Sequence, residues 1–162
     1  MRLAIISDTH LPRGARAIPD ACLERLCGAD AILHAGDLIE LSVLDELEAL
    51  GPPVYAVRGN VDSAEVQARL PLTRVVEAGG ARIAMVHDGG PTHGRLERLR
   101  RRFPDAHAVV FGHSHLPLLE ERDGFAIFNP GSPTERRRAE SHTMGIATVR
   151  DGRAEFELIT LD

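Results

Sequence analysis

Short apolar runs alternate with amphipathic segments as far as residue 60. Each run ends in polar residues, which predicts a buried strand, and the apolar positions between the runs recur with helical spacing. The resulting order, βαβαβ, predicts parallel strands joined by right-handed crossovers. The strands are predicted at 2–7, 31–36 and 54–59, and the helices at 19–28 and 41–50.

Beyond residue 70 the pattern changes to pairs of apolar strands joined by tight turns. Gly79-Gly80, Asp123-Gly124 and Asp151-Gly152 each separate two such strands, which is typical of β-hairpins. A parallel half and a hairpin-rich half predict one α/β (α+β) domain over residues 1–162, with two mixed sheets face to face and helices outside. The hairpins are predicted at 73–88, 116–132 and 145–161, a helix at 94–103 with its Arg run in solvent, and a strand at 107–112.

The composition is that of an ordinary soluble protein, with 43% hydrophobic and 27% charged residues in 162. The N-terminus lacks a secretory pattern and no apolar run reaches the roughly 18 residues of a membrane span, so we expect a cytoplasmic protein without membrane association. A formal charge of -5 argues against general nucleic-acid affinity. Every basic residue is Arg, which excludes Schiff-base chemistry by lysine. Cys22 and Cys27 are predicted to be buried in the first helix.

Residues able to bind metal ions stand directly after five of the predicted strands. Any one of these short motifs is common in turns, but five in succession are not explained by turns. Parallel sheets place their functional sites at the carboxyl ends of strands, so we expect the five to meet. They are Asp8 and His10, His34 and Asp37, Asn60 and Asp62, His87 and Asp88, and His113 and His115.

Seven of these residues form a set of mixed oxygen and nitrogen ligands without a thiolate. Such a set suits Mn, Fe, Zn, Ni, Co or Mg and disfavours a structural zinc site. It is too large for one tetrahedral ion and is the right size for two that share a carboxylate. If the chain stayed extended beyond Gly112, the last two histidines would lean the same way and clamp one ion. The number of other ligands favours instead that the two imidazoles diverge to neighbouring ions, with Gly112 allowing a tight turn into the site. The seven are Asp8, His10, Asp37, Asn60, His87, His113 and His115.

The ordered motifs D-x-H, GD, GN-x-D, H and GH-x-H resemble those of the calcineurin-like metallophosphoesterases. The form "HAGD" of the second motif and "NPGS" at 129–132 resemble the small YfcE-like phosphodiesterase branch. This resemblance extends from residue 5 to about 138 and covers most of the chain. It implies a four-layer αββα sandwich with a dinuclear metal centre at the carboxyl ends of the strands.

The resemblance also implies which residues bind each ion, with Asp37 as the bridge. In such centres the ions lie roughly 3.5 to 4 Å apart and share a hydroxide that attacks phosphorus in line. Mn is the first expectation for both ions. The implied ligands are Asp8, His10, Asp37 and His115 for one ion, and Asp37, Asn60, His87 and His113 for the other.

Two positions depart from the family pattern. Many phosphatase relatives have a proton-donating histidine directly after the Asn of the GN motif, where this chain has Val61, so diesters or esters with good leaving groups are favoured. Relatives commonly read H-G-H where this chain has "HDGG" at 87–90. His93 either replaces the second histidine or is a surface loop residue. Asp88 either holds an imidazole or anchors the loop or a helix end.

Each remaining polar residue near the motifs has two interpretations. His34 either faces the site or is a hydrogen-bonded core histidine, and Asp62 either orients a ligand or only starts the next segment. Arg58 either meets a phosphate or forms a structural ion pair. The arginines at 136–138 either bind substrate charge or lie in a solvated loop.

These features predict a metal-dependent hydrolase of small phosphodiesters. Two alternatives remain open. One is a metal-binding interaction scaffold of the same fold, similar in architecture to the retromer subunit, although all seven ligand positions are filled here. The other is a nuclease acting on nucleotides or nucleic acid, against which the acidic charge and the lack of Trp argue. The family resemblance also makes a homo-oligomer plausible.

Overall fold

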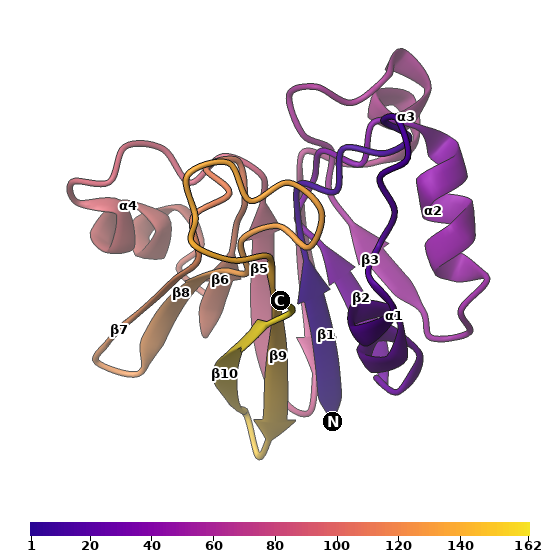
Figure 1. The fold of residues 1–162 in the computed structure, drawn as a ribbon. Coiled ribbons are helices and arrows are strands. Elements are labelled where there is room, and N and C mark those ends of the chain that lie inside the picture. The colour runs from indigo at the N-terminus through magenta and orange to yellow at the C-terminus, as the bar shows by residue number, and fades with distance from the viewer.

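Two five-stranded sheets form the centre of the molecule (Figure 1). The structure is a computed structural model that describes residues 1–162. The first sheet contains β1 (Arg2–Ile6), β2 (Ala31–His34), β3 (Val54–Ala56), β9 (Thr143–Arg150) and β10 (Arg153–Thr160). The second contains β4 (Thr73–Ala78), β5 (Ala81–Val86), β6 (Ala108–Val110), β7 (Leu118–Arg122) and β8 (Phe125–Asn129). Their spatial orders are β10-β9-β1-β2-β3 and β4-β5-β6-β8-β7.

Both sheets are mixed. β1, β2 and β3 pair in parallel, as the βαβαβ pattern predicts, while β9 and β10 add an antiparallel hairpin beside β1. In the second sheet β5, β6 and β8 are parallel, and β4 and β7 are antiparallel edge strands. The three predicted hairpins are therefore confirmed.

The side chains of β1 show how one strand contributes to two cores. Leu3 and Ile5 lie between the sheets, in a cluster that includes Phe128 of the second sheet. Ala4 and Ile6 lie in the cluster on the outer face of the first sheet. Successive side chains of a strand point to opposite faces, so an entirely apolar strand covers both layers.

Helices cover the outer faces of both sheets (Figure 1). On the first sheet lie α1 (Asp20–Cys27), α2 (Leu41–Glu48) and α3 (Ala64–Arg69), which contribute Leu26, Leu44 and Val66 to one apolar cluster. On the second lies α4 (Arg95–Arg102), whose Leu96 and Leu99 cluster with Phe111. The predicted four-layer αββα sandwich is confirmed.

The elements differ from the sequence predictions in three details. The three parallel strands of the first sheet end earlier than predicted, because the chain turns sharply into the loops that carry the polar motifs. Helix α3 was not predicted; its signal is Ser63, whose side chain accepts a hydrogen bond from the backbone N–H of Val66. The prediction that Cys27 is buried is wrong. Cys22 and Leu26, four residues apart, form the inward face of α1, and Cys27 is turned to solvent.

None of the helices combines the length and the apolar character needed to span a membrane.

Candidate metal centre

The candidate ligands follow β1, β2, β3, β5 and β6, and the structure brings them together at the carboxyl ends of these strands. Two groups of three have ligand atoms within 4.8 Å of one another. We call Asp8, His10 and His115 the buried triad, because all three side chains are buried. We call Asp37, His87 and His113 the open triad, because His113 is exposed.

Asp37 lies between the two triads. Its Oδ2 atom is 3.3 Å from Nε2 of His10 in the buried triad and 3.2 Å from Nε2 of His87 in the open triad. Asn60 belongs with the open triad, since its Oδ1 atom is 3.0 Å from His87 Nε2 and 3.0 Å from His113 Nδ1. The grouping has the same members as the one that the family resemblance implies.

The backbone of the ligand loops has an unusual conformation. Five candidate ligands have positive φ, which costs a residue with a side chain about 1 kcal/mol or more. Such strain is kept where the surrounding structure requires it, and functional sites are common examples. The residues are Asp8 (56°), His10 (49°), Asp37 (59°), His113 (70°) and His115 (59°).

The chain does not stay extended beyond Gly112, because His113 and His115 are both left-handed, and the two histidines lie in different triads. Gly112 is needed for a close approach instead. A Cβ atom there would lie 1.9 Å from Ser7 Oγ and 2.7 Å from Asp8 Oδ2. The missing side chain therefore allows the loop after β6 to reach the loop after β1, where the N–H of His113 donates to Asp8 Oδ2 at 3.0 Å.

The hydrogen bonds of three imidazoles leave their Nε2 atoms directed at acidic oxygens. Nδ1 of His115 donates to the carbonyl of Glu135, and Nδ1 of His87 donates to the carbonyl of Ala35 at 2.8 Å. Nδ1 of His10 lies 3.0 Å from the Glu135 carboxylate. In a neutral ring the Nε2 atom then carries a lone pair.

These lone pairs face other electron pairs. Nε2 of His10 and Nε2 of His115 are buried without a hydrogen-bond partner, and His115 Nε2 lies 3.5 Å from Asp8 Oδ1. Facing lone pairs repel each other unless a cation stands between them. The donor set therefore fits divalent metal ions, and the tied Nδ1 atoms are the arrangement that holds metal-binding imidazoles in place.

The pKa shifts of these side chains also indicate that the site attracts cations. Burial alone would lower the pKa of His10, but the carboxylates of Asp37, Asp8 and Glu135 outweigh it and raise that pKa to about 9. The pKa of His87 is also raised against the effect of its burial, chiefly by Asp37 and Asp8. Although burial opposes it, His10 and His87 hold the pKa of Asp37 far below its usual range. A proton and a metal ion thus compete for the same nitrogens.

Glu135 is the residue near the site that the sequence analysis missed. Its carboxylate contacts Nδ1 of His10 and lies 3.4 Å from Arg16 Nη1, and its carbonyl accepts from His115. It therefore orients both histidines of the buried triad. The available signal was its place three residues after "NPGS": Ser132 Oγ of that motif donates to the Asp8 carbonyl at 2.8 Å and accepts from the N–H of Glu135.

His34 is buried and connects two ligand loops. Its Nδ1 accepts the N–H of Gly36 at 3.2 Å, so its Nε2 carries the proton and donates to Thr9 Oγ1 at 3.0 Å. Burial lowers the pKa of His34 to about 3, so the ring is neutral. Both interpretations of this residue hold in part: it is a hydrogen-bonded core histidine, and it supports the loops of Asp8 and Asp37.

Asp62 orients the backbone of a candidate ligand, as the first of its two interpretations states. Its carboxylate accepts three backbone N–H groups, from Asp37 at 3.2 Å, Ile39 at 2.7 Å and Gly59 at 2.6 Å. It joins the loop after β2 to the loop after β3. Carboxylate bonds to three N–H groups make this a firm connection.

Two residues of the loop after β5 lie outside the triads. The carboxylate of Asp88 accepts the N–H of Gly90 at 2.7 Å, which is the loop-anchoring interpretation; it holds no imidazole. His93 is an exposed loop residue, and its carbonyl accepts from Arg98 at 3.2 Å. The hypothesis that His93 supplies a further ligand is not supported by this placement.

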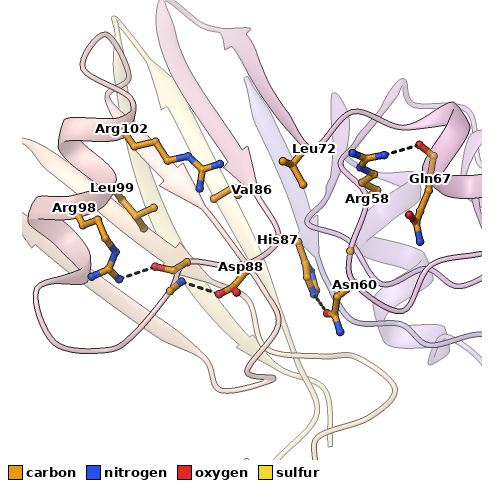
Figure 2. A pocket seen from close by; sticks show the side chains of 13 residues that line it. Arg58, Asn60, Gln67, Leu72, Val86, His87, Asp88, Arg98, Leu99 and Arg102 are labelled. Carbon is orange, nitrogen blue, oxygen red and sulfur yellow. Dashed lines mark hydrogen bonds between the residues drawn. The ribbon is translucent and has the colours of Figure 1, made fainter.

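The arginines also differ in placement. Arg58 forms no ion pair, so that interpretation is wrong; its Nη1 donates to the carbonyl of Gln67 at 3.1 Å. Its side chain lines a cavity of about 590 Å³ that Asn60 and His87 also line (Figure 2). The arginines at 136–138 are exposed, as expected of a solvated loop.

Comparison with known proteins identifies the family. Residues 1–152 match the calcineurin-like phosphoesterase superfamily domain. A probable metallophosphoesterase of Methanothermobacter thermautotrophicus is 35% identical over 89% of this chain and 84% of its own. The phosphodiesterase YfcE of Escherichia coli is 30% identical over 82% of this chain and 79% of its own. A Vps29 variant from Entamoeba histolytica has the same fold, with a TM-score of 0.79, 24% identity and full coverage of both chains. The chain belongs to the calcineurin-like phosphoesterase superfamily, whose members depend on divalent metal ions.

Proposed function

We propose that the protein is a phosphodiesterase with a dinuclear metal centre. The observation that carries the proposal is the arrangement of His10, His87 and His115, whose Nε2 lone pairs converge on the carboxylates of Asp8 and Asp37. Either protons or metal ions relieve this arrangement, and the membership in the superfamily supports metal ions in that role. The likeness to a named phosphodiesterase supports diesters as the substrates.

The proposed ligands follow the two triads. Asp8, His10, Asp37 and His115 would hold one ion, and Asp37, Asn60, His87 and His113 would hold the other. Asp37 would serve both ions, because its Oδ2 atom is the one that approaches a histidine of each triad. The mixed oxygen and nitrogen donors make Mn²⁺ our first choice among the divalent ions.

The centre would perform hydrolysis at phosphorus. When bound, two divalent ions lower the pKa of a water and polarise the phosphoryl oxygens. One water is consumed: its oxygen bonds to phosphorus, one ester P–O bond breaks, and the departing alcohol or phenol takes up a proton. Glu135 would keep the side chain of His10 in position through its carboxylate. Asp62 would keep the loop after β2 in position by accepting its backbone N–H groups.

The leaving group has no proton donor at the position after Asn60. Val61 stands there, 42% exposed beside the open triad, and cannot protonate a departing oxygen. Esters whose leaving groups need no proton are therefore the better substrates. This supports aryl diesters as test compounds.

The test is hydrolysis by metal-stripped protein before and after Mn²⁺ is added, with bis(p-nitrophenyl) phosphate and p-nitrophenyl phosphate as substrates. We expect turnover only with metal, and faster turnover of the diester. Asp37→Asn protein purified in the same way is the control for a contaminating enzyme. Absence of metal-dependent turnover of both compounds would contradict the proposal.

An interaction scaffold is the competing function, since the Vps29 structure has the same fold. Likeness at that level of identity concerns the fold alone. The complete set of ligands and their fixed histidine orientations favour the enzyme. A scaffold with a remnant site would bind metal without turnover, and the same assay separates the two.

A further inference from the structure

A cleft adjoins the open triad and is lined from two sides (Figure 2). On one side the segment after β3 contributes Arg58, and on the other α4 contributes Arg102. Figure 2 shows these two side chains on opposite walls, with Leu72 and Val86 between them and with His87 and Asn60 at one end. The cleft therefore runs from candidate metal ligands to a pair of arginines.

The cleft carries an excess of positive charge. Its lining includes three arginines and one acidic residue, Asp88, although the chain as a whole has a formal charge of -5. Arg98 donates to the carbonyls of Gly89, Pro91 and His93, so its donors serve the loop. Because carbonyl oxygens are neutral, they do not cancel the positive charge of Arg98, which still contributes to the electrostatic field of the cleft.

The other two arginines have donors to spare. Arg102 forms no hydrogen bond or ion pair within the chain and only lies over the ring of Phe103. Arg58 uses Nη1 for the carbonyl of Gln67 and has no acidic partner. A guanidinium carries five N–H donors, which bind carboxylate and phosphate oxygens well. Arg100, Arg101 and Arg102 are all exposed, as expected of a solvated face, and Arg102 in addition lines the cleft.

The wall between the arginines is apolar. Leu72 is 54% exposed and Val86 is buried, and both line the cleft. A hydrocarbon stem bound in the cleft would pack against this exposed leucine, and the removal of apolar surface from water would favour binding. The cleft thus presents candidate metal ligands at one end and, away from them, an apolar surface flanked on its two sides by guanidinium groups without acidic partners (Figure 2).

We propose that this cleft binds the organic group of the substrate and that Arg58 and Arg102, on its two walls, attract a second anionic group of the substrate, a carboxylate or phosphate, away from the candidate metal ligands. The inference rests on the proposed function, because it takes the scissile phosphate to lie at the open triad. It names the substrate class: phosphodiesters whose organic group has an apolar stem and ends in a second anion.

The test uses matched ligands that differ only in the terminal group. Hexyl, ω-carboxypentyl and ω-phosphonopentyl p-nitrophenyl phosphates report turnover, and the corresponding alkyl phosphates, without the nitrophenyl group, report binding by calorimetry to Mn²⁺-loaded protein. The five-carbon stem is flexible, so the terminal anion can search the whole cleft. We expect both anionic compounds to bind about tenfold more tightly than the hexyl compound and to be turned over in preference to it.

Substitutions assign the preference to the two arginines. Arg102→Gln and Arg58→Gln should each lower the ratio of anionic to hexyl affinity about threefold or more. Arg101→Gln, a neighbour on α4 that does not line the cleft, is the control for overall charge and should keep the wild-type ratio. Arg102 is the safer variant because its side chain makes no internal hydrogen bond.

The outcomes separate the inference from the proposed function. Equal binding of the hexyl and anionic compounds, with metal-dependent turnover intact, overturns the inference alone. Preferential binding of the anionic compounds without turnover supports the anion site while the phosphodiesterase proposal fails. A preference that Arg101→Gln removes as fully as Arg102→Gln would reflect overall charge and would also overturn the inference.

Discussion

The buried triad and the open triad contain the same kinds of residue in different surroundings. Asp8 and His115 have no exposed side-chain surface, and both histidines of the buried triad are held at Nδ1 by Glu135. In the open triad His113 is exposed, and its Nδ1 meets only the side chain of Asn60, which is exposed as well. One triad is fixed by the protein interior, and the other lies at the edge of a cleft.

This difference indicates a division of roles. Ligands that are buried and hydrogen-bonded hold an ion in one geometry, because their rotamers are already set. Ligands at a solvent-facing cleft leave room for substrate to approach. We therefore expect the buried triad to determine metal retention and the open triad to determine contact with substrate.

The largest effect is expected from Asp37→Asn, which removes the charge shared by both triads. Asn tolerates the left-handed backbone at this position, so the fold should survive. The loss of shared charge should weaken both sites and lower diester hydrolysis about 1,000-fold. Metal content by mass spectrometry and the rate of hydrolysis check this result. Retention of two tightly held ions would show that Asp37 is no bridge.

Single histidine substitutions compare the two triads directly. His115→Ala should release the ion of the buried triad and His113→Ala that of the open triad, each leaving one ion per chain. The activity should fall about 100-fold or more in both, with the greater loss for His115, whose ring is buried. Circular dichroism verifies that each variant is folded. Equal loss of both ions in either variant would mean that the triads are not separate sites.

Glu135→Gln tests the support of the buried triad alone. The neutral side chain keeps its volume but weakens the interaction with His10 Nδ1, so affinity at the buried triad should fall about 10- to 100-fold. The open triad, which Glu135 does not contact, should keep its affinity and serves as the internal control. Metal titration monitored by calorimetry resolves the two steps.

The pH dependence of metal binding follows from the raised histidine pKa values. In the metal-free protein the pKa of His10 is about 9, so this ring carries a proton at pH 7 that metal binding must displace. The pKa of His87 in the open triad is also raised, chiefly by Asp37 and Asp8, so a proton competes with a metal ion there as well. Affinity should therefore rise about tenfold per pH unit from pH 7 to 8 and level off near pH 9. Calorimetry in buffers of different ionisation enthalpy measures the released protons, and none would be released if both rings were already neutral.

The smallest effect is expected from His93→Ala. This histidine is exposed and its side chain contacts neither triad, so metal affinity should change less than about twofold. A metal titration beside the His113→Ala variant provides the comparison. A large loss of affinity would make His93 the missing ligand of the open triad.

The sequence by itself determined the kinds of elements and the list of candidate ligands. The Gly79-Gly80, Asp123-Gly124 and Asp151-Gly152 turns specify hairpins through local backbone geometry, and apolar periodicity marks the strands. Polar residues at successive strand ends predict a shared site, because parallel strands end at one edge. These signals depend only on neighbouring residues in the chain, so they can be interpreted without knowing which segments pack against each other.

Only the tertiary structure decided how those residues are used. Glu135 contacts His10 although the two are far apart in the chain, and Asp62 holds the loop of Asp37. Arg58 and Arg102 face one cleft because α4 and the segment after β3 fold toward each other across the two sheets. Which nitrogen of a histidine points at the site depends on the acceptor beside its other nitrogen. These contacts are non-local, and no pattern of neighbouring residues contains them.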